Sequence, residues 1–263
     1  MSTKIVYILM LCTGCVACTK VVKLPLRVAP TQYVIEGNIT DQPGPYLVRV
    51  FQTAAFYDSN SFRGVAGATV ELSDDKGNRE LLVDSGGGNY YTQHLRGIPG
   101  NGYLMKVVIG KDMFSASSVM PRLVPLDGLT VGPMTNSGKT VLVAMPEFVN
   151  PAGPGVAYYL FNQTINGRLD KTLYYWNSQN SAGQANSIDL ARSDPDSTLH
   201  VGDSIGIEMQ CLDEAMYTYW SGLDAAATGN GGSYPGNPVT NVAGGALGYF
   251  SAHTSRVMGR RVD

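Results

Sequence analysis

The stretch Tyr33-Val-Ile-Glu-Gly-Asn-Ile-Thr40 alternates apolar and polar residues, and this pattern decides the fold class. Successive side chains of a β-strand point to opposite faces, so the alternation predicts a strand with one buried face. Further runs of this kind follow, separated by turns such as Asp74-Asp75-Lys-Gly77; they span residues 46–50, 68–73, 80–83, 103–109 and 113–119. Strands with this regular spacing favour a small β-sandwich.

A proline-rich break separates this first block from a second one. Pro121 to Pro125 interrupts the strand pattern, which predicts an N-terminal β-sandwich over residues 32–122 and a C-terminal β-rich domain over residues 123–263. In the second block, runs of strand character span residues 126–131, 140–148, 156–164, 173–176 and 204–212. We therefore predict an all-β protein of two β-sandwich-like blocks.

One short helix is expected in the second block, near residues 213–228. Asp213 is a good N-cap residue, and Gly229 is suited to follow the end of a helix. Between them, apolar residues recur at helical spacing, namely Met216, Tyr219, Trp220, Leu223 and Ala227. Such a stripe most often packs a helix onto a sheet, and a surface for a partner is the alternative.

The composition is typical of an all-β protein outside the cytoplasm. Only 15% of the 263 residues are charged, Gly (31) and Pro (14) are abundant, and Tyr (15) outnumbers Phe (7). The formal net charge of −2 gives no excess of basic residues. We therefore expect no nucleic-acid partner.

The N-terminal segment has the features of a secretory signal. Lys4 supplies the positive charge, residues 5–12 form an apolar run, and small residues follow it. The run is too short to span a bilayer, so residues 1–17 are predicted to be a signal peptide and residues 18–31 a tether. A cysteine after small residues resembles a bacterial lipobox, in which the thiol is acylated. Both Cys18 and Cys15 fit, and an ordinary cleaved signal is the alternative.

Two motifs resemble catalytic or phosphate sites but are better explained as structure. Gly202-Asp-Ser204-Ile-Gly206 matches the G-x-S-x-G pattern of serine hydrolases, yet the residues after it predict a strand where a nucleophile elbow needs a helix. Gly138-Lys139-Thr140 resembles the end of a phosphate loop, but a strand follows it too, which predicts a hairpin turn. The histidines are far apart in the sequence, so we expect no metal site.

The second block also contains a lone cysteine and a group of aromatic residues. Cys211 has apolar neighbours, which predicts a buried position, and no intrachain disulfide is expected. Trp176, Tyr219 and Trp220 are candidates for stacking on a sugar or a hydrophobic ligand, although such residues more often fill a core. We expect no catalytic residues and no cofactor.

Several segments occur in an order that resembles a known family. They are Cys18-Thr-Lys-Val-Val22, the Val34-Ile-Glu-Gly37 strand, Val201-Gly-Asp203-Ser-Ile205, Tyr217-Thr-Tyr219-Trp220 and Asn241-Val-Ala-Gly-Gly245-Ala-Leu-Gly248-Tyr-Phe250. The series is similar to the Bacteroidota lipoprotein family called domain of unknown function 4249, over essentially the whole chain. The resemblance implies lipid attachment at Cys18, and an Ig-like or transthyretin-like first block, as in carboxypeptidase regulatory domains.

The same resemblance implies an outer-membrane lipoprotein, often encoded beside TonB-dependent receptors, without established enzyme activity. Our leading hypothesis is a non-catalytic accessory protein, with membrane lipid and an outer-membrane protein as partners, held near such a receptor or another envelope assembly. A glycan- or peptide-binding surface lipoprotein and a structural subunit of a surface filament are the alternatives. Lys20 and Lys23 stand where surface-exposed lipoproteins of that phylum usually carry acidic residues, so the cell surface and the periplasmic face both stay open.

Overall fold

The computed structural model describes residues 30–54, 62–136, 138–192, 198–229 and 236–263. The predicted signal peptide and both candidate lipid-attachment residues, Cys15 and Cys18, lie outside these ranges, as does the predicted tether up to residue 29. Residues 31–263 form one compact unit. Its elements in chain order are β1 (Tyr33–Thr40), β2 (Leu47–Gln52), β3 (Arg63–Gly64), β4 (Thr69–Asp74), β5 (Arg79–Leu81), β6 (Val83–Asp84), β7 (Asn89–Tyr91), β8 (Gly102–Ile109), β9 (Asp112–Val119), β10 (Gly128–Asn136), β11 (Lys139–Val149), β12 (Tyr158–Ile165), β13 (Arg168–Leu169), β14 (Tyr174–Asn177), β15 (Ala185–Ser187), β16 (Ser204–Leu212), α2 (Glu214–Thr228), β17 (Val242–Ala243) and β18 (Leu247–Arg261).

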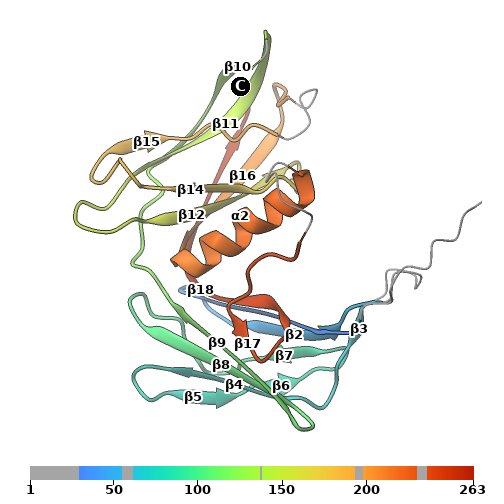
Figure 1. The fold of residues 1–263 in the computed structure, drawn as a ribbon. Coiled ribbons are helices and arrows are strands. Elements are labelled where there is room, and N and C mark those ends of the chain that lie inside the picture. The colour runs from blue at the N-terminus through green and yellow to red at the C-terminus, as the bar shows by residue number, and fades with distance from the viewer. Residues whose placement is uncertain (1–29, 55–61, 137, 193–197, 230–235) are drawn as a thin grey trace, which may run out of the picture. The chain divides into compact units, whose positions relative to one another are not determined.

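A mixed sheet of ten strands runs through the unit. Its order is β13-β12-β16-β18-β1-β2-β7-β6, with β14 paired to β12 and β3 paired to β2. β1 and β18 are parallel, with Val34 opposite Leu247 and Thr40 opposite His253. In Figure 1, β18 is the red strand that extends between β1 and β16. The first described strand of the chain therefore pairs with the last one.

The first core lies between one end of this sheet and a five-stranded sheet with the order β17-β9-β8-β4-β5. Ile35 and Ile39 of β1 are fully buried in it, together with Met105 of β8 and Phe250 of β18. The alternation of the 33–40 stretch puts one set of side chains in this core and the other set on the opposite face. A sandwich-like arrangement around the first core is confirmed.

The second core lies between the other end of the long sheet and a three-stranded sheet with the order β10-β11-β15. Phe148 of β11 contacts the rings of Tyr159 and Phe161 of β12, with ring centroids 4.9 and 5.8 Å apart. Ile207 and Met209 of β16 are buried in the same cluster. The prediction of an all-β protein with two sandwich-like blocks is confirmed.

Both cores lie on one face of the long sheet. Along β18, Phe250 and Ala252 belong to the first core, and Thr254, two residues further on, stands opposite Cys211 of the second core. Alternate residues of a strand share a face, so the two smaller sheets cover the same side. The opposite side, which we call the outer face, is partly covered by α2, which packs beside β12, β14 and β18 (Figure 1).

The predicted helix is confirmed together with its caps. The Asp213 carboxylate accepts a hydrogen bond of 2.9 Å from the Met216 N–H, and Gly229 ends the helix with a φ of 69°, which a glycine adopts without strain. Met216 and Tyr219 of α2 pack on Leu160 and Leu212 of the sheet. The apolar stripe is therefore a packing surface on the outer face.

The C-terminal part of the chain also contributes to the first core. Val242 of β17 pairs with Ala116 of β9, and Ala246, Phe250 and Ala252 are buried with the residues of the first block. The strand pattern of the sequence did not predict this contribution. The division of the chain at residues 122 and 123 and the Ig-like or transthyretin-like likeness stay predictions.

Candidate functional site

The outer face of the long sheet is polar across its central strands. Its outward positions on four adjacent strands are Glu36, Asn38 and Thr40 of β1, Tyr249, Ser251, His253 and Ser255 of β18, Glu208 and Gln210 of β16, and Asn162 of β12. Each alternates with residues that fill the two cores. The result is a band of amide, hydroxyl, imidazole and carboxyl groups on strands whose other face is apolar.

This band is hollowed in two adjoining places. One hollow has a volume of 540 Å³ and reaches from Asn38 to Asn162 and Trp220. The other has a volume of 420 Å³ and reaches from Asn38 to Glu36 and Arg49. Asn38, Thr40 and Tyr249 line both hollows, so we treat the two as one site, the outer-face groove.

One rim of the groove is a loop that Asp170 holds in place. Its Oδ1 accepts hydrogen bonds of 3.1 Å from the N–H and the hydroxyl of Thr172. Its Oδ2 accepts from the Tyr174 hydroxyl at 3.1 Å and from Arg192 Nε at 3.2 Å. Burial acts to raise the pKa of Asp170, but these hydrogen bonds and the arginine charge outweigh it and hold that pKa below its usual value.

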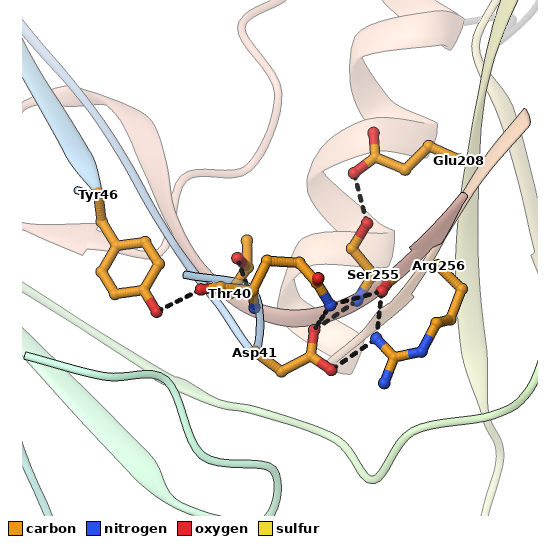
Figure 2. Close-up of polar contacts among 7 residues, drawn as sticks. Thr40, Asp41, Tyr46, Glu208, Ser255 and Arg256 are labelled. Atoms are coloured by element: carbon orange, nitrogen blue, oxygen red, sulfur yellow. Dashed lines mark hydrogen bonds and ion pairs between the residues drawn. The ribbon is translucent and has the colours of Figure 1, made fainter. Parts of the chain in front are cut away.

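Glu208 ties together the strands beneath the groove. Its carboxylate accepts a hydrogen bond of 2.6 Å from the Ser255 hydroxyl of β18 (Figure 2). It also accepts one of 2.9 Å from the Asn162 amide of β12. Burial acts to raise the pKa of Glu208, yet the hydrogen bonds that its charged form accepts keep the pKa below its usual value. Glu208 is thus an ionised acceptor that links three adjacent strands.

At one end of the groove, side chains replace β1 as the partner of β18. The last paired residue of β1 is Thr40, opposite His253. Beyond it, the Asp41 carboxylate accepts hydrogen bonds from the Ser255 N–H at 2.9 Å and from Arg256 Nη1 at 2.8 Å (Figure 2). The Ser255 carbonyl accepts from Gln42 Nε2 and from Arg256 Nη1. The backbone of Ser255 is therefore satisfied after the neighbouring strand has left the sheet.

His253 lines the groove and is only 4% exposed. Its Nδ1 shares a hydrogen bond of 2.9 Å with the Ser251 hydroxyl. Its Nε2 has no hydrogen-bond partner among the described residues, and this atom is not fully buried. Burial lowers the pKa of His253 to about 4, so the ring is neutral near pH 7.

The other end of the groove carries a pair of opposite charges. Glu36 of β1 stands opposite Arg49 of β2. Burial raises the pKa of Glu36, and the charge of Arg49 acts in the other direction. Beside them, the Asn38 amide donates a hydrogen bond of 3.2 Å to the Tyr249 hydroxyl, which fixes the ring at the centre of the groove.

The structure separates the three aromatic residues that the sequence singled out. Trp220 is half-buried on α2 and lines the groove, with its ring centroid 5.1 Å from that of Tyr249. Tyr219 is buried beside them, 5.0 Å from Tyr249. Trp176 lies on the opposite face of the sheet, where its ring packs against Phe148 and Tyr159 of the second core. A role for these residues in ligand binding stays a prediction.

The structure agrees with the structural explanations of the other motifs. Ser204 begins β16, and its N–H donates to Asn166 Oδ1 at 2.9 Å, so the predicted strand after Gly202 is confirmed. Asn136 and Lys139 face each other where β10 turns into β11, as expected for a hairpin. Cys211 is a free, buried cysteine of the second core.

Sequence reasoning missed most residues of the groove. Asn38, Thr40, Asn162 and Gln210 lie on predicted strands, where polar residues at alternate positions can be taken for an ordinary solvated face. The signal in the sequence that could have pointed to them is the regular alternation of polar and apolar residues over the whole length of these strands. Tyr249 and His253 lie on β18, which the pattern analysis did not assign as a strand.

Comparison with known proteins identifies the family. Residues 19–257 match the model of the family described as Domain of unknown function (DUF4249), and the chain belongs to this family. A search of curated proteins gives no match. Among the residues that the structure describes, no helix has the length and apolar character needed to cross a membrane. In the same residues, no group of three or more His, Cys, Asp or Glu side chains is placed to hold a metal ion.

Proposed function

We propose that this protein is a non-catalytic, lipid-anchored accessory protein of the bacterial outer membrane that binds through the outer-face groove. The observation that carries the proposal is the groove, a polar hollow with an aromatic wall on central strands of a sheet. Small-molecule sites have volumes of about 300–1,000 Å³, and each half of the groove is within this range.

The carboxylates in and below the groove support binding over catalysis. Asp170 and Glu208 are both held in the ionised form by several hydrogen bonds, and each fixes a part of the groove wall or floor. A general acid needs a raised pKa, and hydrolysis of a glycosidic bond uses a second carboxyl group beside it. Glu36 has a raised pKa, as a general acid requires, but the charged side chain opposite it is the basic Arg49 in place of a second carboxyl group.

The anchor and the location are part of the same proposal. The sequence around Cys18 resembles a lipobox, and the family match begins at residue 19, directly after this cysteine. An acylated Cys18 holds the compact unit at the membrane, where it binds its ligand beside a TonB-dependent receptor or another envelope assembly.

Metabolic labelling with an alkyne-tagged fatty acid tests the anchor. We expect the full chain to become labelled and to fractionate with outer membranes, and the Cys18→Ser variant to lose both properties. Cys15→Ser is the matched control and keeps them. An unlabelled wild-type chain in the soluble fraction would contradict the proposal.

Affinity purification from detergent-solubilised membranes tests the accessory role. The tagged full chain is expected to recover an outer-membrane protein, which mass spectrometry identifies, and the Cys18→Ser variant is expected to recover less of it. Recovery of the tagged chain alone, from membranes in which it is anchored, would refute the association with a receptor or assembly.

A further inference from the structure

We propose that the outer-face groove binds a neutral oligosaccharide chain. This inference rests on the proposed function, because it names the class of ligand for the same groove. Four features carry it: the balance of charge, the kind of hydrogen-bonding groups, the use of the backbone groups and the aromatic wall.

The charge of the groove is balanced. The two acidic residues in its lining are Glu36 and Asp170, and the two basic ones are Arg49 and Lys171. The charge of Asp170 is further compensated by Arg192, which donates to it at 3.2 Å. His253 is neutral near pH 7 because burial lowers its pKa. A strongly charged ligand would find no excess of the opposite charge here, so an uncharged ligand fits best.

The hydrogen-bonding groups of the groove match hydroxyls. Asn38, Asn162 and Gln210 carry carboxamides, and Thr40 carries a hydroxyl, so each can both donate and accept. His253 adds a ring nitrogen, Nε2, that has no partner among the described residues; it accepts or donates according to the tautomer that Ser251 selects. A sugar hydroxyl satisfies either form, because it is itself a donor and an acceptor.

The backbone of the groove offers little place for an added strand. β16 pairs on one side with β12 and on the other with β18, whereas β18 pairs with β1 up to His253 and with β16 from the next residue onward. On the other edge of β18, side chains take the place of a strand. Asn241 bonds the N–H and C=O of Phe250. Ser118 Oγ accepts from the Ala252 N–H. A peptide that binds by β-augmentation needs the free N–H and C=O groups of an edge strand. Recognition in the groove therefore depends on side chains, which favours a ligand with many hydroxyls over an extended peptide.

The groove also has an apolar surface on which a sugar ring can stack. Trp220 and Tyr249 line it together, with interplanar angle 58° and centroids 5.1 Å apart, and Leu160 lies beside them. Aromatic rings combine a large apolar area with little loss of side-chain entropy on binding. A pyranose ring presents an apolar C–H face for such contact and hydroxyls at its edge for the polar floor.

A direct test uses the full chain in detergent micelles and a glycan array that covers neutral plant, fungal and bacterial polysaccharides, followed by titration with the hexasaccharide of the strongest hit. The chain has two tryptophans, so replacing each in turn shows which of them produces the change in fluorescence on binding. Trp220→Phe should abolish the fluorescence response, and Trp176→Phe, a change in the second core, should keep it. Asn38→Ala should raise the Kd about tenfold, as expected for the loss of one good hydrogen bond. Asn186→Ala, on β15 outside the groove, should leave the Kd unchanged.

Each outcome decides the inference. Binding of a neutral glycan that weakens in Asn38→Ala, with melting temperatures close to the wild type, supports it. The inference is overturned if no neutral glycan on the array binds. It is also overturned if an oligogalacturonide or a neutral hexapeptide binds equally well, or if Asn38→Ala leaves the Kd unchanged. Fatty-acid labelling and recovery of an outer-membrane protein are independent of this result, so failure of the ligand class is distinct from failure of the proposed function.

Discussion

Arg256 donates a hydrogen bond of 2.8 Å from Nη1 to the Asp41 carboxylate at the point where β18 loses β1 as its neighbour. The Asp41 side chain is only 7% exposed, and the same carboxylate accepts from the Ser255 N–H. The Asp41–Arg256 pair therefore also satisfies the backbone of β18, which an ion pair on the solvent-exposed surface does not do. It lies where β18 passes from the first core to the second.

Asp41→Ala should lower the free energy of unfolding by roughly 2–3 kcal/mol, because it leaves the Ser255 N–H without its acceptor and the half-buried Arg256 guanidinium without its carboxylate partner. Denaturant titration measures this value. Asp75→Ala removes an exposed ion pair with Lys76 and is the matched control, for which we expect a change below about 1 kcal/mol. Equal effects of the two substitutions would show that the Asp41 contacts add nothing beyond a surface pair.

The stability of the protein should fall as the pH drops from about 6.5 to about 4, in part because of His253. Burial lowers its pKa from 6.5 to about 4, although the carboxylates of Glu208, Asp41 and Asp213 act to raise it. In this window the unfolded chain binds a proton at His253 and the folded chain does not, so acid favours unfolding. A difference of one pKa unit corresponds to about 1.4 kcal/mol, so the loss is on the order of 3 kcal/mol.

His253→Gln tests this assignment, because glutamine does not titrate. We expect the variant to lose less stability than the wild type between pH 6.5 and pH 4.5, measured by denaturant titration at each pH. The exposed His94 serves as the control, and His94→Gln should reproduce the wild-type slope. A wild-type slope in His253→Gln would refute the role of the buried imidazole.

Gly248→Ala should be severely destabilising, by more than about 3 kcal/mol. A Cβ at this position would lie 2.1 Å from the carbonyl oxygen of Ile35, where β18 begins to pair with β1, and the φ of 97° is strained for alanine. Gly245→Ala is the matched control, because its φ of 87° is similar but no atom lies within 4 Å of the added Cβ. It should cost about 1–2 kcal/mol, the strain alone. Similar melting temperatures for the two variants would exclude close packing as the reason for Gly248.

Asp170→Asn should loosen the rim of the groove. The neutral amide loses the charge that Arg192 pairs with, and its nitrogen cannot accept the hydrogen bonds that one carboxylate oxygen now accepts. We expect faster amide hydrogen exchange in residues 169–173 and a destabilisation of about 1–3 kcal/mol. The exposed Asp112 at the β8–β9 turn is the control, and Asp112→Asn should leave the exchange rates of the rim unchanged.

The parts of the fold that follow from local pattern could be predicted from the sequence. The 33–40 strand has one buried and one polar face, and the helix has a capping aspartate, an apolar stripe and a terminal glycine. In such elements the pattern reports which face is buried. The pattern also placed Cys211 in a core.

β18 could not be predicted in this way, because both of its faces are covered between residues 250 and 255. Only Phe250 and Ala252 of this stretch are apolar, while Ser251, His253, Thr254 and Ser255 are buried and polar. Hydrogen bonds to Glu208, Asp41 and each other stabilise several of these groups. A polar strand of this kind has the composition of a loop, so periodicity does not reveal it.

The groove escaped prediction for a related reason. It depends on the parallel pairing of β1 with β18, which brings together Asn38 and Tyr249, 211 residues apart in the chain. No local signal specifies such a contact. Trp220 was singled out for its side chain, but its place beside Tyr249 came from the fold.

The pairing of β1 with β18 has a consequence for how the polypeptide matures. A nascent chain emerges with its N-terminal residues first, so Leu247, the partner of Val34, is made long after it. Until then β1 lacks its β18 partner, and an unpaired strand edge is prone to association with other chains. A stop before Leu247 would remove β18, which contributes Phe250 and Ala252 to the first core and pairs with β16 beside the second core, so both cores would lose a part.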